Sequence, residues 1–283
     1  MSIPGDPAVQ DIILNGMKEG GQYTVSAGST AYTEFKNYQF ETLKSELWAA
    51  CKTDRLLETE GVVLAAVGKT TLTLPTDFDS AIRLVLYDAD DSFRGTLQAA
   101  TANTVTLAST FSSTLELMYG RKIFTLSGTG AGQYLEVIGY DDSTKVANLS
   151  ANWGTTPDAT TTYMVASTEV ELRRRDYQRQ VTEAARPRVY GVFAASVQVL
   201  PVPDKIYPII ILYRANLTRL DDAGAVFVKH LRERRSLWIH GVKMKTMARY
   251  DDDRYPVTKA DWDQALMMYA ADNVVYDTME PNR

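Results

Sequence analysis

Apolar residues recur at helical spacing near the start of the chain. In "DPAVQDIILNGMKEGG" they fall at Val9, Ile12, Ile13 and Met17, which predicts an amphipathic helix ending at a pair of glycines. A second helix is predicted over residues 32–53. Its apolar stripe contains Phe40, Leu43, Leu47, Trp48 and Cys51.

The period changes from helical to alternating after Gly61. The run "AIRLVLYD", residues 81–88, predicts a buried strand. From about Asp88 to Ser167 the chain is rich in Thr, Ser and Gly, and short apolar runs separated by turn residues predict an all-β module. The strands expected there cover residues 104–107, 115–120, 133–141, 145–149 and 161–166.

The remaining third is predicted to contain strands and then helices. "SVQVLPVPD" and "YPIIILYRANL" predict two strands, followed by one helix from Ala223 to Tyr250 and a final helix capped by Thr258. The predicted fold class is therefore α+β: a helical bundle with a small antiparallel β-sheet, plus an inserted all-β module. We expect residues 1–87 and 168–283 to form the discontinuous body and residues 88–167 the inserted domain.

Composition narrows the classes of protein to consider. The chain has 283 residues, of which 45% are hydrophobic and 23% charged, as in an ordinary globular protein. Its net charge of −5 argues against general affinity for nucleic acid. The single cysteine, Cys51, excludes an intrachain disulfide, and no signal peptide or membrane span is expected.

The glycines of "SGTGAGQYLEVIGYDD", at residues 128, 130 and 132, can belong to a phosphate loop or to a tight turn. A phosphate loop leads from a strand into a helix, commonly through Gly-Lys-Ser/Thr. Here the glycines lead into "QYLEVI", which predicts a strand. We therefore expect a β-hairpin turn and no bound nucleotide.

Residues that carry catalysis or bind metals form no recognisable constellation. His230 and His240 lie on one predicted helix about 15 Å apart along its axis, too far to share a metal ion, and the apolar spacing around His230 predicts that it packs in the core. The consecutive carboxylates at 251–253 lack the alternation, glycine and distal Glu of a calcium loop. No catalytic, cofactor-binding or metal-binding residue is predicted, although carboxylate pairs that are distant in sequence stay open.

The last helix carries two apolar stripes, where a surface helix usually buries one. Trp262, Leu266, Tyr269 and Tyr276 form the first, and Met268, Ala271, Val275 and Met279 form the second. One stripe can meet the rest of the chain and the other a second protein, or the helix can be buried within one chain. The arginines of "KHLRERRS" suggest either a solvated face or an interface with an acidic partner or DNA phosphates.

Two stretches resemble the head-to-tail adaptor proteins of tailed bacteriophages, also called head-completion, connector or tail tubular A proteins. They are "LTLPTDFDSAIRLVLYD" and "RPRVYGVFAASVQVLPVPDKIYPIIILYRANLTRL", with helices predicted on both sides. The stretch "GTGAGQYLEVIGYDDSTKVANLSANWGTTPDATTTYMV" is similar to a β module found in many phage structural proteins. Simpler adaptors lack this insertion.

The resemblance implies a virion structural protein, made in the host cytoplasm, that forms a ring of about twelve copies in the neck of the virion. Its partners would be the portal protein, tail or nozzle proteins and further copies of itself, with DNA passing through the lumen during packaging and ejection. It would have no enzymatic activity. The interface is expected to contain Trp262, Leu266, Met268, Tyr269, Val275, Tyr276, Arg232, Arg234 and Arg235.

A tail-fibre or carbohydrate-binding protein is the main alternative. It requires exposed aromatic side chains on the β module, where Tyr134, Tyr140, Trp153 and Tyr163 are available. No coiled-coil heptads typical of fibres are present. A phage hydrolase is a third hypothesis, and it needs a catalytic constellation that the sequence does not display.

Overall fold

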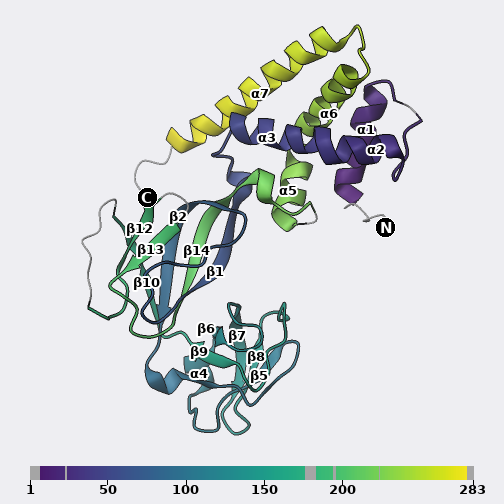
Figure 1. Ribbon diagram of the computed structural model, residues 1–283. Coiled ribbons are helices and arrows are strands. Elements are labelled where there is room, and N and C mark those ends of the chain that lie inside the picture. Colours follow the sequence, from purple (N-terminus) through teal and green to yellow (C-terminus); the bar gives the residue numbers. More distant parts are fainter. Residues whose placement is uncertain (1–6, 23, 176–182, 194–195, 223, 279–283) are drawn as a thin grey trace. The chain divides into compact units, whose positions relative to one another are not determined.

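The structure is a computed structural model that describes residues 7–278 except 23, 176–182, 194–195 and 223 (Figure 1). The chain forms two compact units. The first, here the helical unit, comprises Met1–Thr59, Thr76–Asp79 and Arg214–Arg283. The second, the β unit, comprises Glu60–Pro75 and Ser80–Tyr213.

The helical unit is built from segments at the two ends of the chain. Its helices are α1 (Pro7–Glu19), α2 (Thr30–Glu34), a π-helical segment (Phe35–Phe40), α3 (Glu41–Ala50), α5 (Ala225–Glu233), α6 (Arg235–Arg249) and α7 (Tyr255–Thr278). Two short 3-10 turns, Arg55–Leu57 and Leu217–Arg219, complete it. The first two predicted helices are confirmed, and Cys51 is buried as its stripe indicated.

Aromatic packing and one close approach between helices hold the helical unit together. Phe40, Phe227 and Trp238 contact one another with ring centroids 5.1–6.4 Å apart, joining the first helices to α5 and α6. Gly16 lets α1 approach α6, because a Cβ atom there would lie 2.5 Å from Cβ of Val242.

Two predictions about the C-terminal helices were wrong. The helix expected from Ala223 to Tyr250 is divided at Arg234 into α5 and α6, so the chain turns a corner there. The last helix begins at Tyr255, and Thr258 does not cap it. Its hydroxyl instead donates to the carbonyl of Arg254 at 3.2 Å, inside the first turn.

The β unit contains three sheets in the described part of the chain. The first has the order β1-β14-β2-β10 and the second β11-β12-β13. Their bounds are β1 (Glu58–Ala65), β2 (Phe78–Asp88), β10 (Thr168–Glu171), β11 (Arg173–Arg174), β12 (Val189–Phe193), β13 (Ser196–Leu200) and β14 (Tyr207–Ala215). The apolar run of β14 suits its central place between β1 and β2, where both faces are covered.

The third sheet has seven strands in the order β3-β9-β6-β7-β8-β5-β4 and comes from the predicted insertion. Its strands are β3 (Arg94–Thr96), β4 (Ala99–Ala100), β5 (Thr104–Thr106), β6 (Lys122–Ser127), β7 (Tyr134–Asp141), β8 (Val146–Leu149) and β9 (Thr162–Val165). The strand expected at 115–120 was wrong: Leu115–Met118 form the short helix α4, because the Thr114 hydroxyl accepts a hydrogen bond from the Leu117 amide.

The glycine-rich stretch is the hairpin turn that the sequence predicted. β6 and β7 pair antiparallel on either side of it. Gly128, Gly130 and Gly132 have φ of +82°, +72° and +83°, a region that favours glycine. At Gly128 a Cβ atom would also lie 2.5 Å from the carbonyl oxygen of Thr160, so the turn leaves no room for a side chain.

The predicted fold class was wrong in its proportions. The described residues form fourteen strands in three sheets, and the structure is 34% helical and 30% strand rather than a helical bundle with a small sheet. The prediction missed strands outside the insertion, where β1, β10 and β11 are short or half-exposed and show weak alternation. No helix among the described residues is long and apolar enough to cross a membrane.

Candidate functional site

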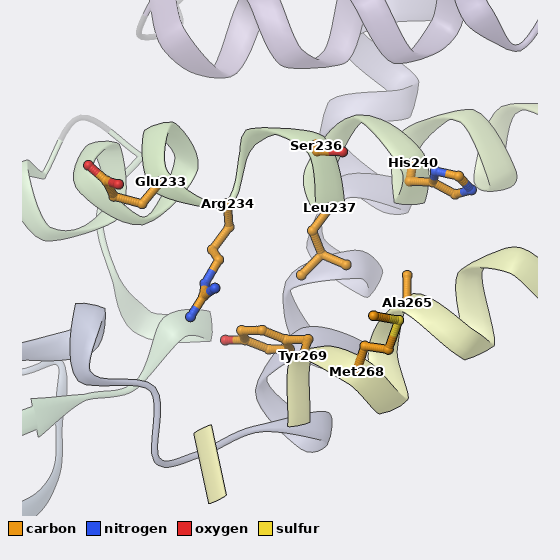
Figure 2. Close-up of a pocket in the computed structure, with 8 residues that line it drawn as sticks. All are labelled: Glu233, Arg234, Ser236, Leu237, His240, Ala265, Met268 and Tyr269. Atoms are coloured by element: carbon orange, nitrogen blue, oxygen red, sulfur yellow. The ribbon is translucent and has the colours of Figure 1, made fainter. Parts of the chain in front are cut away.

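A hollow of about 380 Å³ lies in the helical unit beside the corner between α5 and α6 (Figure 2). The lining side chains are Glu233, Arg234, Ser236, Leu237, His240, Ala265, Met268 and Tyr269. The first five come from the corner and the start of α6, and the last three from one face of α7. Figure 2 shows Arg234 extending toward the ring of Tyr269.

The corner forms because Arg234 leaves the helical region, with φ −108° and ψ 25°, while its amide still donates to the carbonyl of His230. α7 contributes Ala265, Met268 and Tyr269, whose spacing of three and four residues places them side by side. The lining of the hollow therefore combines apolar side chains with charged side chains from the corner.

Beneath the hollow lies a buried polar network centred on Asp54. The Oδ1 atom of Asp54 accepts from the Leu56 amide at 2.9 Å, and Oδ2 accepts from the hydroxyl of Tyr269 at 2.8 Å. The Nε2 atom of His230 lies 3.4 Å from the same Oδ2, and Nε of Arg234 lies 3.5 Å from it. Three elements that are far apart in sequence thus meet at one carboxylate.

The neighbours of His230 define its tautomer. The indole Nε1 of Trp238 donates to Nδ1 of His230 at 3.1 Å, and an indole nitrogen can only donate. Nδ1 must therefore be the acceptor, so Nε2 carries the proton and points at Asp54 and Tyr269. His230 is fully buried, which confirms the expectation that it packs in the core.

The two acidic groups of this network have opposite protonation behaviour. Burial raises the pKa of Asp54, but hydrogen bonds from His230, the Leu56 amide and Tyr269 outweigh burial and hold the pKa well below its usual range. Burial, followed by the charge of Asp54 and its hydrogen bond, raises the pKa of the Tyr269 phenol. Asp54 is therefore the anion and Tyr269 a neutral donor, with the guanidinium of Arg234 5.2 Å from the tyrosine ring.

The network is suited to fixing helices rather than to catalysis. Asp54, His230 and Tyr269 are 1%, 0% and 5% exposed, so no substrate can reach the carboxylate and imidazole in this structure. Buried polar groups that hydrogen-bond to one another favour one packing arrangement over others. Here they fix α5, α6 and α7 against the turn that follows α3.

The structure separates the predicted interface residues into two groups. Trp262 and Tyr269 are buried in their own unit, and Leu266 is half-buried. Met268 is exposed, as are Arg232 and Arg235. Val275 and Tyr276 belong to the last turns of α7, where the side chains lie outside the described residues.

The hollow brings together Arg234, Met268 and Tyr269 of the predicted set. Arg235 instead forms an ion pair with Asp11 of α1 at 2.7 Å. Sequence reasoning missed Asp54 and Trp238, whose positions next to His230 depend on contacts across the chain. One local signal was present. Asp54 directly precedes "RLL", and an aspartate in that position is typical of a cap, as Asp54 caps the 3-10 turn that follows.

The described residues contain no group of three His, Cys, Asp or Glu side chains that could hold a metal ion. In the acidic run, Asp252 pairs with Arg254 at 2.6 Å, as a structural turn would. Of the aromatics that the carbohydrate-binding alternative requires, Tyr140, Trp153 and Tyr163 are buried. Tyr134 is half-buried and stacks on Phe124.

No protein-family model matches the chain, and no curated protein matches it significantly.

Proposed function

We propose that the chain is a head-to-tail adaptor of a tailed bacteriophage, forming a ring in the neck of the virion between the portal and the tail. In this role it binds neighbouring copies, the portal protein and tail or nozzle proteins, and it catalyses no reaction. The supporting observation in the structure is an exposed apolar surface on α7, a helix that Trp262 and Tyr269 anchor in its own unit.

α7 has 24 residues, which corresponds to a length of about 36 Å. Trp262 and Tyr269 anchor it, being 1% and 5% exposed. On the same helix, Val257, Met267 and Met268 are 67%, 67% and 60% exposed. Exposed apolar side chains grouped on one element mark surfaces that bind other proteins, and methionine adapts readily to a partner's surface.

The charge of the chain is consistent with a DNA channel. Each copy carries a net charge of −5, so a ring of copies would be acidic. An acidic lumen repels the phosphate backbone and lets the genome slide without adhering. This role does not require specific contacts with DNA bases.

The test is electron microscopy of the purified chain, alone and mixed with the portal protein from the same genome. We expect a ring added coaxially to the portal. The double variant Met267→Asp/Met268→Asp should abolish the ring, because charges on the α7 surface cannot be buried between subunits without a large desolvation cost.

A matched control places two aspartates on exposed apolar positions of the β unit, Val67→Asp and Ile138→Asp. This variant should still form the ring. A bare portal with the wild-type chain would contradict the proposal, and loss of the ring in both variants would contradict the assignment to α7.

A further inference from the structure

A second hollow, of about 260 Å³, lies in the β unit, remote in sequence from α7. Its lining comes from Tyr87 near the end of β2, from residues 120–122 at the start of β6, and from residues 166–169, which lead from β9 into β10. The volume is below the usual range for drug-sized ligands and suits a group the size of a phosphate or a carboxylate.

Two of the three charged groups in this hollow offset each other. The ammonium of Lys122 donates to the hydroxyl of Tyr87 at 2.6 Å and lies 4.6 Å from the centre of its ring. Burial, and then a hydrogen bond with Glu169, raise the pKa of Tyr87, so the phenol stays protonated and can donate to that carboxylate. Lys122 and Glu169 are therefore connected through one hydroxyl.

The third charge, on Arg121, has no such compensation. It forms no ion pair with the described residues, and its Nη1 atom makes no hydrogen bond with them. The guanidinium lies 5.0 Å from the centre of the Phe93 ring, which holds its plane in place. A guanidinium that lines a hollow without a carboxylate partner leaves donors for a ligand, and an oxyanion is the acceptor that the planar guanidinium fits best.

Hydroxyl groups extend the set of donors. Ser167 and Thr168 are exposed and line the same hollow. The β2–β10 pairing fixes their backbone, since Thr168 is in register with Asp88 and the Ser167 amide donates to the Asp88 carbonyl at 3.0 Å. The Ser167 hydroxyl already donates to the Asp88 carbonyl at 3.3 Å, whereas the Thr168 hydroxyl can rotate to face a bound oxygen.

We propose that this hollow binds a small oxyanion, a phosphate or carboxylate group, through the guanidinium of Arg121 with the hydroxyl of Thr168 as an additional donor. The site is independent of the adaptor role and of the α7 surface. The ligand can be free in solution or part of a larger molecule, and both sources share this chemistry.

Isothermal titration calorimetry of the full chain tests the proposal, with inorganic phosphate and acetate as probes at equal ionic strength set by chloride. We expect saturable binding of at least one probe. Arg121→Gln should weaken it about tenfold, because the charge-assisted hydrogen bonds are lost. Arg121→Lys should weaken it less, because the charge remains while the bidentate geometry is lost.

Arg173→Gln is the matched control, since it removes the same charge from an exposed position of the same unit that does not line the hollow. It should bind like the wild type. Thr168→Val provides a second test if Arg121→Gln does not fold, and should weaken binding severalfold. Binding of phosphate alone or acetate alone identifies the ligand class. No saturable binding of either probe, or equal affinity in wild type and Arg121→Gln, would overturn the proposal.

Discussion

Asp54 is the residue on which the helical unit depends most for its polar packing. Its two oxygens accept hydrogen bonds from opposite directions, Oδ1 from the Leu56 amide and Oδ2 from Tyr269. An asparagine has only one oxygen acceptor, so in either orientation its NH₂ group would face a donor. Asp54→Asn should therefore lower the free energy of unfolding by about 2–4 kcal/mol at neutral pH.

The same substitution has a predictable pH dependence. The pKa of Asp54 is lowered in the folded state, so its stabilising contribution is complete above the unfolded pKa of about 3.9 and is lost as the pH falls below it. The difference between wild type and Asp54→Asn should shrink progressively as the pH falls below about 4 toward the lowered folded-state pKa. Urea unfolding at several pH values measures this difference. Asp253→Asn, at an exposed acidic position, should behave like the wild type throughout. A difference independent of pH would contradict the assignment of the charge to Asp54.

Single residues were predictable where their surroundings are local. The apolar spacing around His230 indicated a buried position, which the structure confirms. Its partners were not predictable, because Tyr269 and Asp54 are 215 residues apart and meet only after the chain folds. Periodicity shows that a side chain is buried but not which polar groups it meets.

At the scale of elements, the contact between α1 and α6 is sensitive to a single methyl group. A Cβ atom at Gly16 would lie 2.5 Å from Cβ and Cγ1 of Val242 and 3.0 Å from the carbonyl oxygen of Ile239. Gly16→Ala gains about 1 kcal/mol of helix propensity. It must also push apart two helices at atoms next to the backbone, which costs about 1–3 kcal/mol.

We therefore expect Gly16→Ala to lower the thermal unfolding midpoint despite the better helix former. Gly61→Ala is the control, because its added Cβ would make an ordinary contact of 3.4 Å with Tyr213. It should leave the midpoint unchanged within a few degrees. Stabilisation by Gly16→Ala would show that α1 does not pack this closely on α6.

Elements were predicted best where one period persists for several turns. The first two helices and the β6–β7 hairpin follow from apolar spacing and from glycines at a turn. The break at Arg234 was missed because apolar spacing continues across it from α5 into α6. The helix α4 was missed because four residues are too short to show a period, and one hydroxyl cap decides the conformation.

At the scale of the whole molecule, the balance of helix and strand was the largest error. The insertion was predicted to be β, but the sheets outside it were underestimated because their strands are distributed between 58 and 215. Such pairings join distant segments, and sequence alternation does not reveal which strands are neighbours. The order β1-β14-β2 shows this, since the central strand is the last of the three in sequence.

The strands of the insertion have a hydrophobic core of their own, which indicates that this segment can fold without the rest of the chain. Val105, Phe111, Val137 and Tyr163 belong to one buried cluster formed only by residues of this segment. The first and last residues of the insertion lie side by side, because the Ser167 amide donates to the carbonyl of Asp88 at 3.0 Å. We predict that residues 88–168, expressed alone, fold into the seven-stranded sheet.

The fragment should be less stable than the same segment in the full chain. Phe124, Leu126 and Met164 pack in a second cluster with Val85 and other residues outside the insertion. Removing these neighbours exposes apolar surface at about 25 cal/mol per Å², and a domain of this size has little stability in reserve. Thermal unfolding followed by circular dichroism should show a cooperative transition at a lower temperature than in the full chain.

Phe124→Ser should lower the midpoint of the full chain strongly and that of the fragment less, because only the full chain buries this ring against the first sheet. A fragment with no cooperative transition would mean that the insertion depends on that sheet to fold.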